Sequence, residues 1–464
     1  MSKKTRLGIL ALMLEGYEPL FPGIIERQKN YVDEIRSTLD GDELETVFPG
    51  VAYNRELIEK YTEQFNRDHL DGILIFLLTY SQGQYIVHAM KKNTLPLALA
   101  LVQPEETVRD DFVELDLTVN QGIHGSQDNA NCLMRSGIPC LFFAGSRLNG
   151  ELQRFVADFA AAAATVTALK DMKIGIVGKL QGMGDVITDD MAVFRKLGPE
   201  IIYDSIGTIW SCCEKVTGEE IMQEQEREKQ LFRIDETMPE EAFSEAVRQY
   251  LGMKRYLEER GYAGFTAHFE EFGADGRFRR LPLLAESNLM ADGYGYGAEG
   301  DAMTAMLMAA MIRMCGIADF SEMYMMDLKR DAVLMCHQGE GNWAMARKDE
   351  KPYLKNRVLS EGGLDNPPTV LFTLEPGPAT VVSLVHVSGE HFRMVVSQGE
   401  ILDEHAMKYN DMPYLFYKPE GGVRGMVTKW LEAGASHHEV IVPGNMEERL
   451  RMLCKMADIE FIRV

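Results

Sequence analysis

Acidic and histidine side chains are the residues of this sequence best suited to chemistry, and some of them stand in unusual surroundings. Glu322 occurs among methionine, phenylalanine and tyrosine residues in the segment DFSEMYMMDL. An unpaired carboxylate is costly to bury, so this neighbourhood favours a metal or another cationic partner, and the alternative is that Glu322 points to solvent. Glu299 and Asp301 close the glycine-rich segment GYGYGAEGD, just before an apolar, helix-like stretch.

Three histidines lie at the edges of strand-like apolar runs: His337 in AVLMCHQGEGN, and His437 and His438 in GASHHEV. A lone histidine in such a place is more often a satisfied residue of the core or its rim than a ligand. Adjacent side chains of a strand point to opposite faces, so at most one of the two neighbouring histidines is expected in a shared site. The spacing of these residues matches no short metal-binding motif, and any metal site would have to be assembled by the fold.

A second glycine-rich segment, GKLQGMGD at residues 178–185, follows a strand-like run and invites comparison with nucleotide-binding loops. Its glycines lack the offsets that bring backbone N–H groups to a phosphate, so a turn is the better interpretation. For GYGYGAEGD at residues 293–301, two interpretations stay open. The segment is either a flexible entry to a buried helix or a loop that lets the backbone approach a ligand.

The composition indicates a soluble globular protein. Of the 464 residues, 46% are hydrophobic and 26% are charged, and 48 basic and 71 acidic residues give a net charge of −23. We expect no nucleic-acid partner, because affinity for a phosphate backbone comes mainly from Lys and Arg, and no membrane partner, because no run approaches the roughly 18 apolar residues of a span. The apolar run 7–14 lacks a cleavage pattern, and the seven cysteines lack zinc-like spacing. Reduced thiols and a cytoplasmic location are therefore expected.

The order of apolar and polar stretches predicts an α/β protein of three domains. Apolar runs at 7–14, 71–80, 95–102 and 140–145 alternate with helix-like segments, which is typical of a parallel sheet covered on both faces. The pattern begins again at 173–178. Within 368–402, short turns separate three strands and indicate antiparallel neighbours. We expect two parallel-sheet α/β domains followed by an antiparallel β-barrel-like domain, with boundaries at 1–168, 169–314 and 315–464.

In these and other segments the sequence resembles the L-arabinose isomerase family, within the wider L-fucose/L-arabinose isomerase group. The matching segments keep the family's order from about residue 117 to 440. Four of them, GYGYGAEGDAMTA, SEMY, CHQGE and AGASHHEV, resemble the metal-binding segments, and their matching residues are Glu299, Glu322, His337 and His438. NQGIHGSQD, GMGDVITDD and FTAHFEEF resemble segments around the substrate, and carry Gln121, His124, Met183 and Phe269.

The resemblance implies a metal-dependent isomerase that interconverts an aldose and a ketose. The four matching residues would hold a divalent metal, usually Mn²⁺, and a mixed oxygen and nitrogen site also suits Co²⁺. Glu299 and Glu322 would act as acid and base in an enediolate mechanism, and a hydride shift between C2 and C1 is the alternative. The resemblance also implies a homo-oligomer, a hexamer or another trimer-based assembly, with shared active sites. In it, His124 reaches a neighbouring subunit's metal and bonds a sugar hydroxyl, while Met183 and Phe269 shape the apolar side of the pocket.

Some segments depart from the family and leave the substrate open. The first strand continues into LEGYEPLFPG, so Glu15 and Tyr17 stand where the family contacts sugar hydroxyls. Arg277, Arg279 and Arg280 precede the metal segment, and they either bind an anionic substituent or form a solvated loop. The small-molecule substrate is expected to be L-arabinose or another aldose, such as a 6-deoxy or anionic 6-substituted hexose. A non-catalytic sugar-binding protein on the same fold is the remaining alternative.

Overall fold

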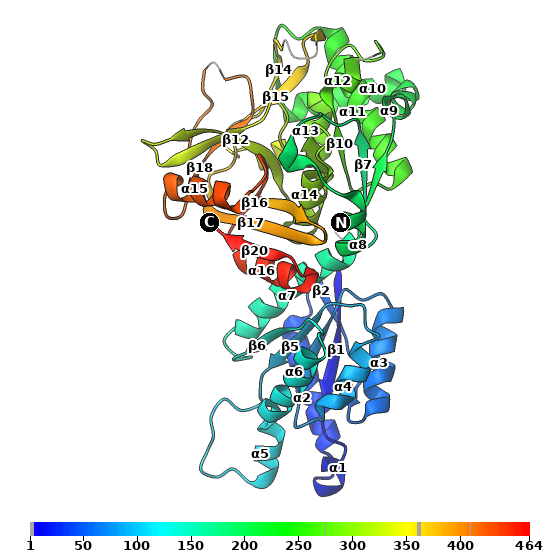
Figure 1. The fold of residues 1–464 in the computed structure, drawn as a ribbon, viewed down its shortest axis with the longest axis vertical. Helices are drawn as coiled ribbons and strands as arrows, with labels where there is room; N and C mark the ends of the chain where they lie inside the picture. Colours follow the sequence, from blue (N-terminus) through cyan, green and yellow to red (C-terminus); the bar gives the residue numbers. More distant parts are fainter. Residues whose placement is uncertain (1–3, 274, 360–362, 409) are drawn as a thin grey trace. The chain divides into compact units, whose positions relative to one another are not determined.

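The computed structural model, drawn in Figure 1, describes residues 4–273, 275–359, 363–408 and 410–464. The chain divides into two compact units, which we call unit 1 (Met1–Thr167 and Glu448–Asp458) and unit 2 (Ala168–Glu447 and Ile459–Val464). The predicted boundary at residues 314 and 315 lies inside unit 2, and the three-domain division stays a prediction. Among the described residues, no helix combines the length and the apolar composition needed to cross a membrane.

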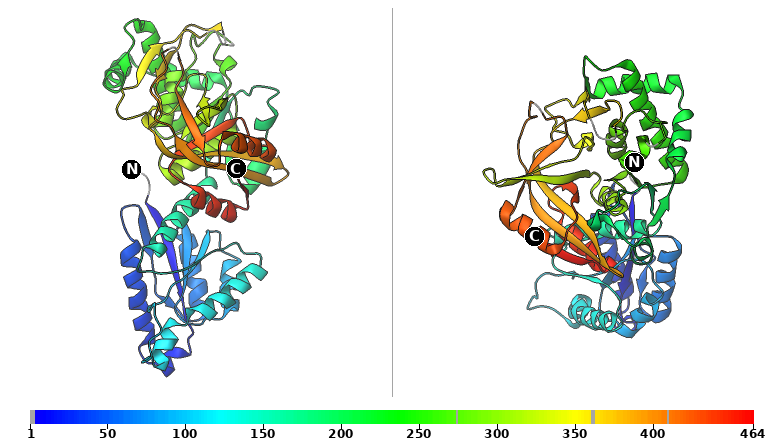
Figure 2. Two further views of the ribbon diagram at one scale, coloured as in Figure 1. Left: turned by 90° about the vertical axis from the view of Figure 1, so that its left-hand side faces the viewer. Right: turned by 45° about the horizontal axis from the view of Figure 1, so that its top comes forward.

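Unit 1 is built on a six-stranded sheet whose described strands pair in parallel, in the order β2-β1-β4-β5-β6, with β3 paired to β1. The continuous apolar runs of β1, β4 and β5 are almost entirely buried, as a parallel sheet covered on both faces requires. Helices lie on both faces of this sheet (Figures 1 and 2). The strands are β1 (Thr5–Leu12), β2 (Leu44–Val47), β3 (Val51–Ala52), β4 (Gly72–Leu77), β5 (Leu97–Leu101) and β6 (Leu141–Ala144). The helices are α1 (Tyr17–Leu20), α2 (Ile24–Leu39), α3 (Arg55–Arg67), α4 (Gly83–Met90), α5 (Glu114–Asn120), α6 (Gly122–Arg135) and α7 (Glu151–Leu169).

Unit 2 begins with a second parallel sheet, of four strands in the order β11-β10-β7-β8. The two parallel sheets confirm the α/β character predicted for the first two thirds of the chain. The strands are β7 (Lys173–Val177), β8 (Glu200–Tyr203), β10 (Gly264–Ala267) and β11 (Gly295–Ala298). The helices are η1 (Gly184–Val186), α8 (Asp190–Lys196), α9 (Ile206–Glu214), α10 (Gly218–Leu231), α11 (Glu240–Arg260), α12 (Phe269–Gly273), α13 (Leu283–Ala291) and α14 (Ala302–Cys315).

The later part of the chain forms a seven-stranded sheet in the order β16-β19-β12-β13-β18-β17-β20, in which β16 also pairs with β17. Its strands are β12 (Asp319–Asp327), β13 (Ala332–Cys336), β16 (Gly377–Ser388), β17 (His391–Ile401), β18 (Tyr414–Pro419), β19 (His438–Pro443) and β20 (Glu460–Arg463). A three-stranded sheet contains β9 (Arg233–Ile234), β14 (Tyr353–Asn356) and β15 (Pro368–Leu371). The short helices η2 (Trp343–Met345) and α15 (Val423–Ala433) and helix α16 (Glu447–Ala457) complete the fold.

The seven-stranded sheet is mixed and not purely antiparallel as predicted. Its pairings are antiparallel except that between β17 and β20, which is parallel. The physical reason is the connection before β20: helix α16 separates it from β19, and a helical crossover returns the chain in the same direction. A barrel-like closure of this sheet stays a prediction.

Glycines in the segment GYGYGAEGD allow helix α14 to pack directly on strand β11. A Cβ atom at Gly295 would lie 2.2 Å from the carbonyl oxygen of Ala305, and one at Gly297 would lie 2.3 Å from that of Asp301. The close backbone approach considered for this segment therefore exists, but its partner is α14. This packing fixes the position of Glu299, which stands between the strand and the helix.

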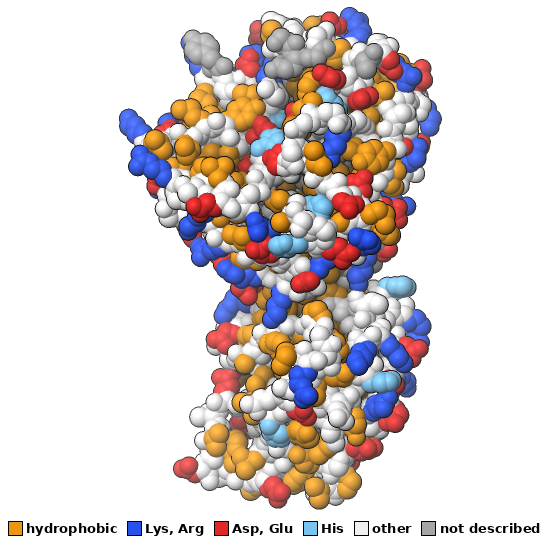
Figure 3. Space-filling view, in the orientation of Figure 1, with side chains coloured by type: hydrophobic (Ala, Val, Ile, Leu, Met, Phe, Trp, Pro, Cys, Tyr) orange, Lys and Arg blue, Asp and Glu red, His pale blue; other side chains and the backbone are white. Residues whose placement is uncertain are grey.

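Buried apolar side chains hold each unit together, while the surface is charged. In unit 1 a cluster including Leu10, Ile73 and Leu99 forms the core between sheet and helices. Acidic and basic side chains are interspersed over the face shown in Figure 3. Ion pairs such as Arg55 with Glu59, 2.6 Å apart, are solvent-exposed, and pairs of this kind contribute about 1 kcal/mol or less.

Candidate active site

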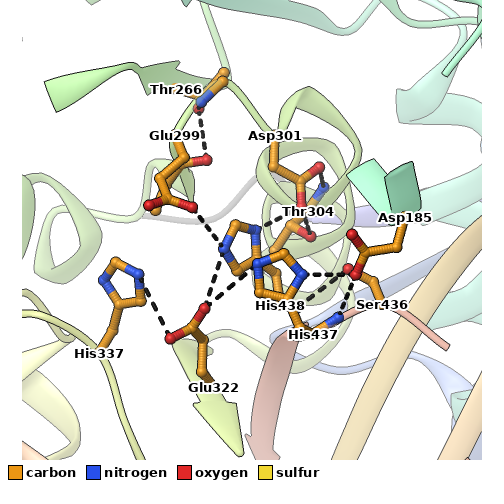
Figure 4. Close-up of polar contacts among 12 residues, drawn as sticks. Asp185, Thr266, Glu299, Asp301, Thr304, Glu322, His337, Ser436, His437 and His438 are labelled. Carbon is orange, nitrogen blue, oxygen red and sulfur yellow. Dashed lines mark hydrogen bonds and ion pairs between the residues drawn. The ribbon is translucent and has the colours of Figure 1, made fainter. Parts of the chain in front are cut away.

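The carboxylates and histidines singled out in the sequence lie together in unit 2 (Figure 4). Two overlapping groups have ligand atoms that all lie within 4.8 Å of one another: Glu299 with His437 and His438, and Glu322 with His337 and His438. Nε2 of His438 is 3.5 Å from Oε1 of Glu322 and 3.7 Å from Oε2 of Glu299. Nε2 of His337 is 3.8 Å from Oε2 of Glu322. The structure thus brings the four predicted ligands together, and their metal-binding role stays a prediction.

Neighbouring strands of the seven-stranded sheet place three of these side chains. Glu322 of β12 lies opposite Cys336 of β13 on one side and opposite His438 of β19 on the other. His337 directly follows Cys336, so β13 brings it to the same region. Glu299 follows β11 with a φ of 62°, in the left-handed region that residues with a side chain seldom occupy. The site therefore depends on strand register for three ligands and on a constrained turn for the fourth.

Carboxylates hold the rings of the buried histidines. Nδ1 of His438 is hydrogen-bonded to Oδ2 of Asp301 at 2.9 Å, and Nδ1 of His337 lies 2.5 Å from Oε1 of Glu340. Asp301 in turn accepts hydrogen bonds from the Thr304 hydroxyl at 2.6 Å and from the Thr304 N–H at 3.0 Å. A carboxylate at Nδ1 fixes the orientation of a ring and leaves Nε2 as the ligand atom. The contact of Asp301 with His438 and that of Glu340 with His337 were not predicted from the sequence, although the spacing His-x-x-Glu and the position of Asp301 before a helix were available signals.

The centre of the cluster contains a buried polar atom without a partner. His438 is fully buried, and its Nε2 has no hydrogen-bond partner among the described residues. Burial alone would lower the pKa of His438, but its contacts with Asp301 and Glu322 raise it to about 10. Burial would raise the pKa of Glu322, and contact with His438 and the nearby imidazoles lowers it instead. A buried nitrogen that faces two carboxylates in this way fits a divalent cation as the shared partner.

His437 corrects the prediction that only one of two neighbouring histidines enters the site. Strand β19 begins at His438, so the alternation of side chains along a strand does not apply to the residue before it. The ring centroids of His437 and His438 are 4.2 Å apart. Nδ1 of His437 is 2.6 Å from Oδ2 of Asp185, and its Nε2 is 3.5 Å from Oε1 of Glu322. Both neighbouring histidines therefore face the same glutamate.

A cavity of about 190 Å³ in unit 2 has Glu299 and His337 in its wall. Phe269, predicted to shape the apolar side of the pocket, is also a wall residue. The rest of the wall combines apolar side chains with a few polar groups, which is typical of small-ligand sites, and includes Phe272, Leu281, Leu283, Glu286, Tyr296, Gln338 and Glu340. Met183 lies just before η1, outside the described wall of this cavity.

The other four predicted substrate residues belong to unit 1. They lie near the carboxyl ends of the strands of its parallel sheet, in segments that follow a strand or begin a helix. Glu15 and Tyr17 follow β1, and Gln121 connects α5 to α6. His124 lies in the first turn of α6 and stacks on Tyr80, which follows β4, at 5.2 Å between ring centroids. In parallel α/β sheets this edge is where ligands bind. The metal-binding candidates all belong to unit 2.

The glycines of the segment QGIHG have a packing role. A Cβ atom at Gly122 would lie 2.2 Å from the carbonyl oxygen of Leu77, and one at Gly125 would lie 2.8 Å from that of Thr79. Helix α6 can therefore begin directly against the end of β4. This approach is what sets His124 at the edge of the sheet.

The arginines suggested for an anionic substituent are paired with carboxylates. Arg277 lies 3.1 Å from Asp275, and Arg279 lies 2.9 Å from Asp365. Arg280 is buried and contacts Glu245. These contacts occupy the three guanidinium groups and disfavour an anion-binding site, while the burial of Arg280 disfavours a fully solvated loop.

Most of the chain is similar in sequence to known proteins. Residues 184–316 match the family model of the L-arabinose isomerase central domain, and residues 317–460 match that of the C-terminal domain. L-arabinose isomerase 1 of Bacillus licheniformis is 27% identical over 435 residues, which cover 92% of this chain and 87% of that protein. L-arabinose isomerase of Clostridium beijerinckii is 26% identical over 457 residues, which cover 95% of this chain and 91% of that protein.

Among solved structures, a periplasmic solute binding protein from Actinobacillus succinogenes with bound D-allose is 11% identical and covers 67% of this chain and 92% of that one, with a TM-score of 0.18. A score this low carries no argument about the present chain. The sequence relatives are decisive: they identify a sugar isomerase, an intramolecular oxidoreductase that interconverts an aldose and a ketose. The chain belongs to the L-arabinose isomerase family.

Proposed function

We propose that this protein is a metal-dependent isomerase that converts an open-chain aldose, L-arabinose or a close relative, to the ketose through an enediolate. The supporting observation is the buried Nε2 of His438, which lacks a hydrogen-bond partner among the described residues and faces Glu299 and Glu322. With His337, these side chains would hold Mn²⁺ or Co²⁺. A divalent cation supplies Lewis-acid stabilisation of developing negative charge, worth several kcal/mol.

The two glutamates carry the proton transfers. One carboxylate takes the proton from C2 of the aldose while the electron pair moves toward C1 and charge develops on O1. Return of a proton to C1 and transfer of the O2 proton to O1 complete the ketose. General acid and base groups of this kind contribute roughly 10²- to 10⁴-fold to the rate. In the metal-free protein, contact with His438 and the nearby imidazoles lowers the pKa of Glu322 against the effect of burial and keeps this carboxylate ionised.

The remaining substrate contacts are assigned to the predicted substrate residues of each unit. Phe269 and the cavity of about 190 Å³ beside Glu299 and His337 would enclose one side of the sugar. Gln121, His124, Glu15 and Tyr17 would supply polar contacts from the carboxyl edge of the unit 1 sheet. In a homo-oligomer with shared sites, these contacts would come from a neighbouring copy. The same arrangement would suit several aldoses, so a substrate assay must identify the sugar.

Metal depletion and a substrate screen test this function. The metal-depleted protein is mixed with Mn²⁺ or Co²⁺ and with L-arabinose, L-fucose, D-galactose or a 6-sulfonated hexose, and ketose formation is measured. We expect turnover of L-arabinose or a structurally similar aldose only when metal is present. The Glu322→Gln variant should lose roughly 10²-fold or more of the turnover rate. Metal-bound protein that forms no ketose from any aldose would support a non-catalytic sugar-binding protein instead.

A further inference from the structure

Helix α13 carries three consecutive polar residues, Glu286, Ser287 and Asn288, although the helix is almost entirely buried. Two of these side chains have partners that belong to the packing of the helix. The Ser287 hydroxyl accepts a hydrogen bond from the Gly341 N–H at 3.3 Å, and the Asn288 amide donates one to Glu228 at 2.7 Å. Helix packing therefore accounts for two of the three polar residues and leaves Glu286 to be explained.

Glu286 is buried in the wall of the cavity of about 190 Å³ that also contains Glu299 and His337. Its polar neighbours are the carboxylate of Glu340 and the hydroxyl of Tyr296, and no basic side chain among the described residues pairs with it. Burial and the nearby Glu340 carboxylate raise the pKa of Glu286 well above its usual range. An unpaired buried charge is costly, so the neutral carboxyl group fits this place, and it can both donate and accept a hydrogen bond.

The polar neighbours of Glu286 are engaged with other groups. The Tyr296 hydroxyl donates a hydrogen bond to Oε1 of Glu340 at 2.9 Å, and the same oxygen lies 2.5 Å from Nδ1 of His337. A hydroxyl group has one proton to donate, so Tyr296 cannot also donate to Glu286. Oε2 of Glu340 is buried and has no hydrogen-bond partner within the part of the chain that the structure describes. Hydrogen-bonding capacity is therefore left over in this part of the wall.

We infer that Glu286 is a substrate-binding residue whose carboxyl group hydrogen-bonds a neutral hydroxyl group of the sugar, on a carbon beyond C2. This inference rests on the proposed function and deepens it. In that function O1 and O2 of the sugar lie beside Glu299 and Glu322, which carry the proton transfers. The described contacts of Glu286 are instead with Glu340 and Tyr296, so it faces a more distant part of the sugar. A few such polar groups in a mostly apolar wall are what orients a small ligand.

The carboxyl group of Glu286 separates the substrates that the sequence leaves open. A hydroxyl group can accept its proton and donate to its second oxygen. A methyl or methylene group at that carbon would leave a buried carboxyl group without a partner, and a site built to bond a hydroxyl rejects the analogue that lacks it. An anionic substituent would place a negative charge beside the Glu340 carboxylate. Glu286 therefore favours an aldose with an unmodified hydroxyl group at that carbon over deoxy or anionic sugars.

Binding of linear sugar alcohols to the Mn²⁺-loaded full chain tests this role without turnover. Calorimetry gives the Kd values of L-arabinitol and of its 3-deoxy, 4-deoxy and 5-deoxy analogues. Glu286→Leu removes the polar group, and Glu286→Gln keeps a donor and an acceptor. The matched control is Glu228→Gln, which changes another fully buried glutamate of raised pKa, outside the described wall of the cavity. Thermal unfolding checks that each variant is folded, and ketose formation by the unmodified chain reports separately on the proposed function.

We expect the unmodified chain to bind at least one deoxy analogue about tenfold or more weakly than L-arabinitol. Glu286→Leu should lose this preference, Glu286→Gln should keep most of it, and Glu228→Gln should keep all of it. If Glu286→Leu weakens the four alcohols by one common factor, or the unmodified chain binds them equally, Glu286 only packs against Glu340. The inference is then wrong, while metal-dependent ketose formation still supports the proposed function. If the unmodified chain binds no alcohol and forms no ketose, both fail together.

Discussion

Single carboxylates decide the geometry of this site as much as the ligands themselves do. Asp301 bonds Nδ1 of His438 and is fixed by two hydrogen bonds from Thr304. Without the negative charge of Asp301, the His438 ring would be freer to rotate, and a proton on Nδ1 would no longer be favoured. A substitution of Asp301 can therefore change metal affinity without removing a ligand.

Replacing Asp301 by Asn should weaken Mn²⁺ or Co²⁺ binding about 10- to 100-fold, because an amide orients and polarises the His438 ring less well than a carboxylate does. Calorimetric titration of the metal-depleted variant measures this. Asp189→Asn is the control. The Asp189 side chain also caps a helix, α8, but among the described residues it contacts none of the carboxylates and histidines of the candidate site. An Asp301→Asn protein with unchanged affinity would contradict the orienting role.

Glu228 on helix α10 should make the free energy of unfolding depend on pH. Its carboxyl group is fully buried, and burial raises its pKa to about 8, partly offset by a hydrogen bond from Asn288 at 2.7 Å. In the unfolded chain the pKa returns to that of an ordinary glutamate. Between these values the native state binds the extra proton, so its stability falls as pH rises, by up to about 1.4 kcal/mol per pH unit.

Glu228→Gln removes this titration and keeps an oxygen that can accept the Asn288 hydrogen bond. We expect the variant to lose less stability than the unmodified protein between pH 5.5 and 8, a range that lies between the two pKa values. Denaturant unfolding at several pH values gives the comparison. Parallel pH profiles for the two proteins would show that this carboxyl group does not titrate as its burial requires.

At the scale of elements, the contact between β11 and α14 positions Glu299. The strand backbone approaches the helix so closely that a Cβ at Gly297 would lie 2.3 Å from the Asp301 carbonyl oxygen and 2.9 Å from the Ala305 nitrogen. Backbone atoms cannot move aside as a flexible side chain would. Any side chain here must separate the strand from the start of α14, which Asp301 caps.

Gly297→Ala should therefore destabilise the protein by about 1–3 kcal/mol and lower metal affinity, since overpacking displaces the segment between β11 and α14. The control is Gly425→Ala in α15, where no described atom outside the surrounding helix backbone lies within 4 Å of the added Cβ. That substitution should stabilise the helix by roughly 0.5–1 kcal/mol. Thermal unfolding separates the cases, and a Gly297→Ala protein as stable as Gly425→Ala would refute the packing argument.

Much of the architecture could be predicted from the order of the residues. The apolar runs at 7–14 and 71–80 became the buried strands β1 and β4, and the turn at Ser388-Gly389 joins β16 to β17. Such patterns are local and reflect burial on one or both faces. The parallel pairing of β20 was not predicted, because a short apolar run does not specify its neighbour in the sheet.

The site was only partly accessible from sequence. Family segments pointed to Glu322 and His438, but the pairing of Asp185 with His437 joins positions 252 residues apart, and no local pattern encodes it. The prediction that only one of the two neighbouring histidines faces the cluster was wrong because it placed both on the strand, whereas β19 begins at His438. Contacts of this kind depend on the packing of whole elements.

For the whole molecule, the proposed shared active site makes a prediction about mixtures. If His124 of one copy serves the metal cluster of another, a mixture of His124→Ala and Glu322→Gln proteins, unfolded and refolded together, should regain part of the activity that each lacks alone. Some mixed sites would combine an intact His124 with an intact Glu322. Activity of the mixture equal to the sum of the separate proteins would argue that each site is built from a single chain.

The proposed function requires that Glu299, Glu322, His337 and His438 bind a catalytic cation. Anomalous diffraction from crystals of the protein grown with Mn²⁺ and a linear sugar alcohol would locate that cation. We predict an anomalous peak within bonding distance of these four side chains, with two adjacent hydroxyls of the alcohol beside it. A sugar alcohol bound at the cavity with no peak at the cluster, or a peak only at other residues, would show that these side chains do not form the metal site.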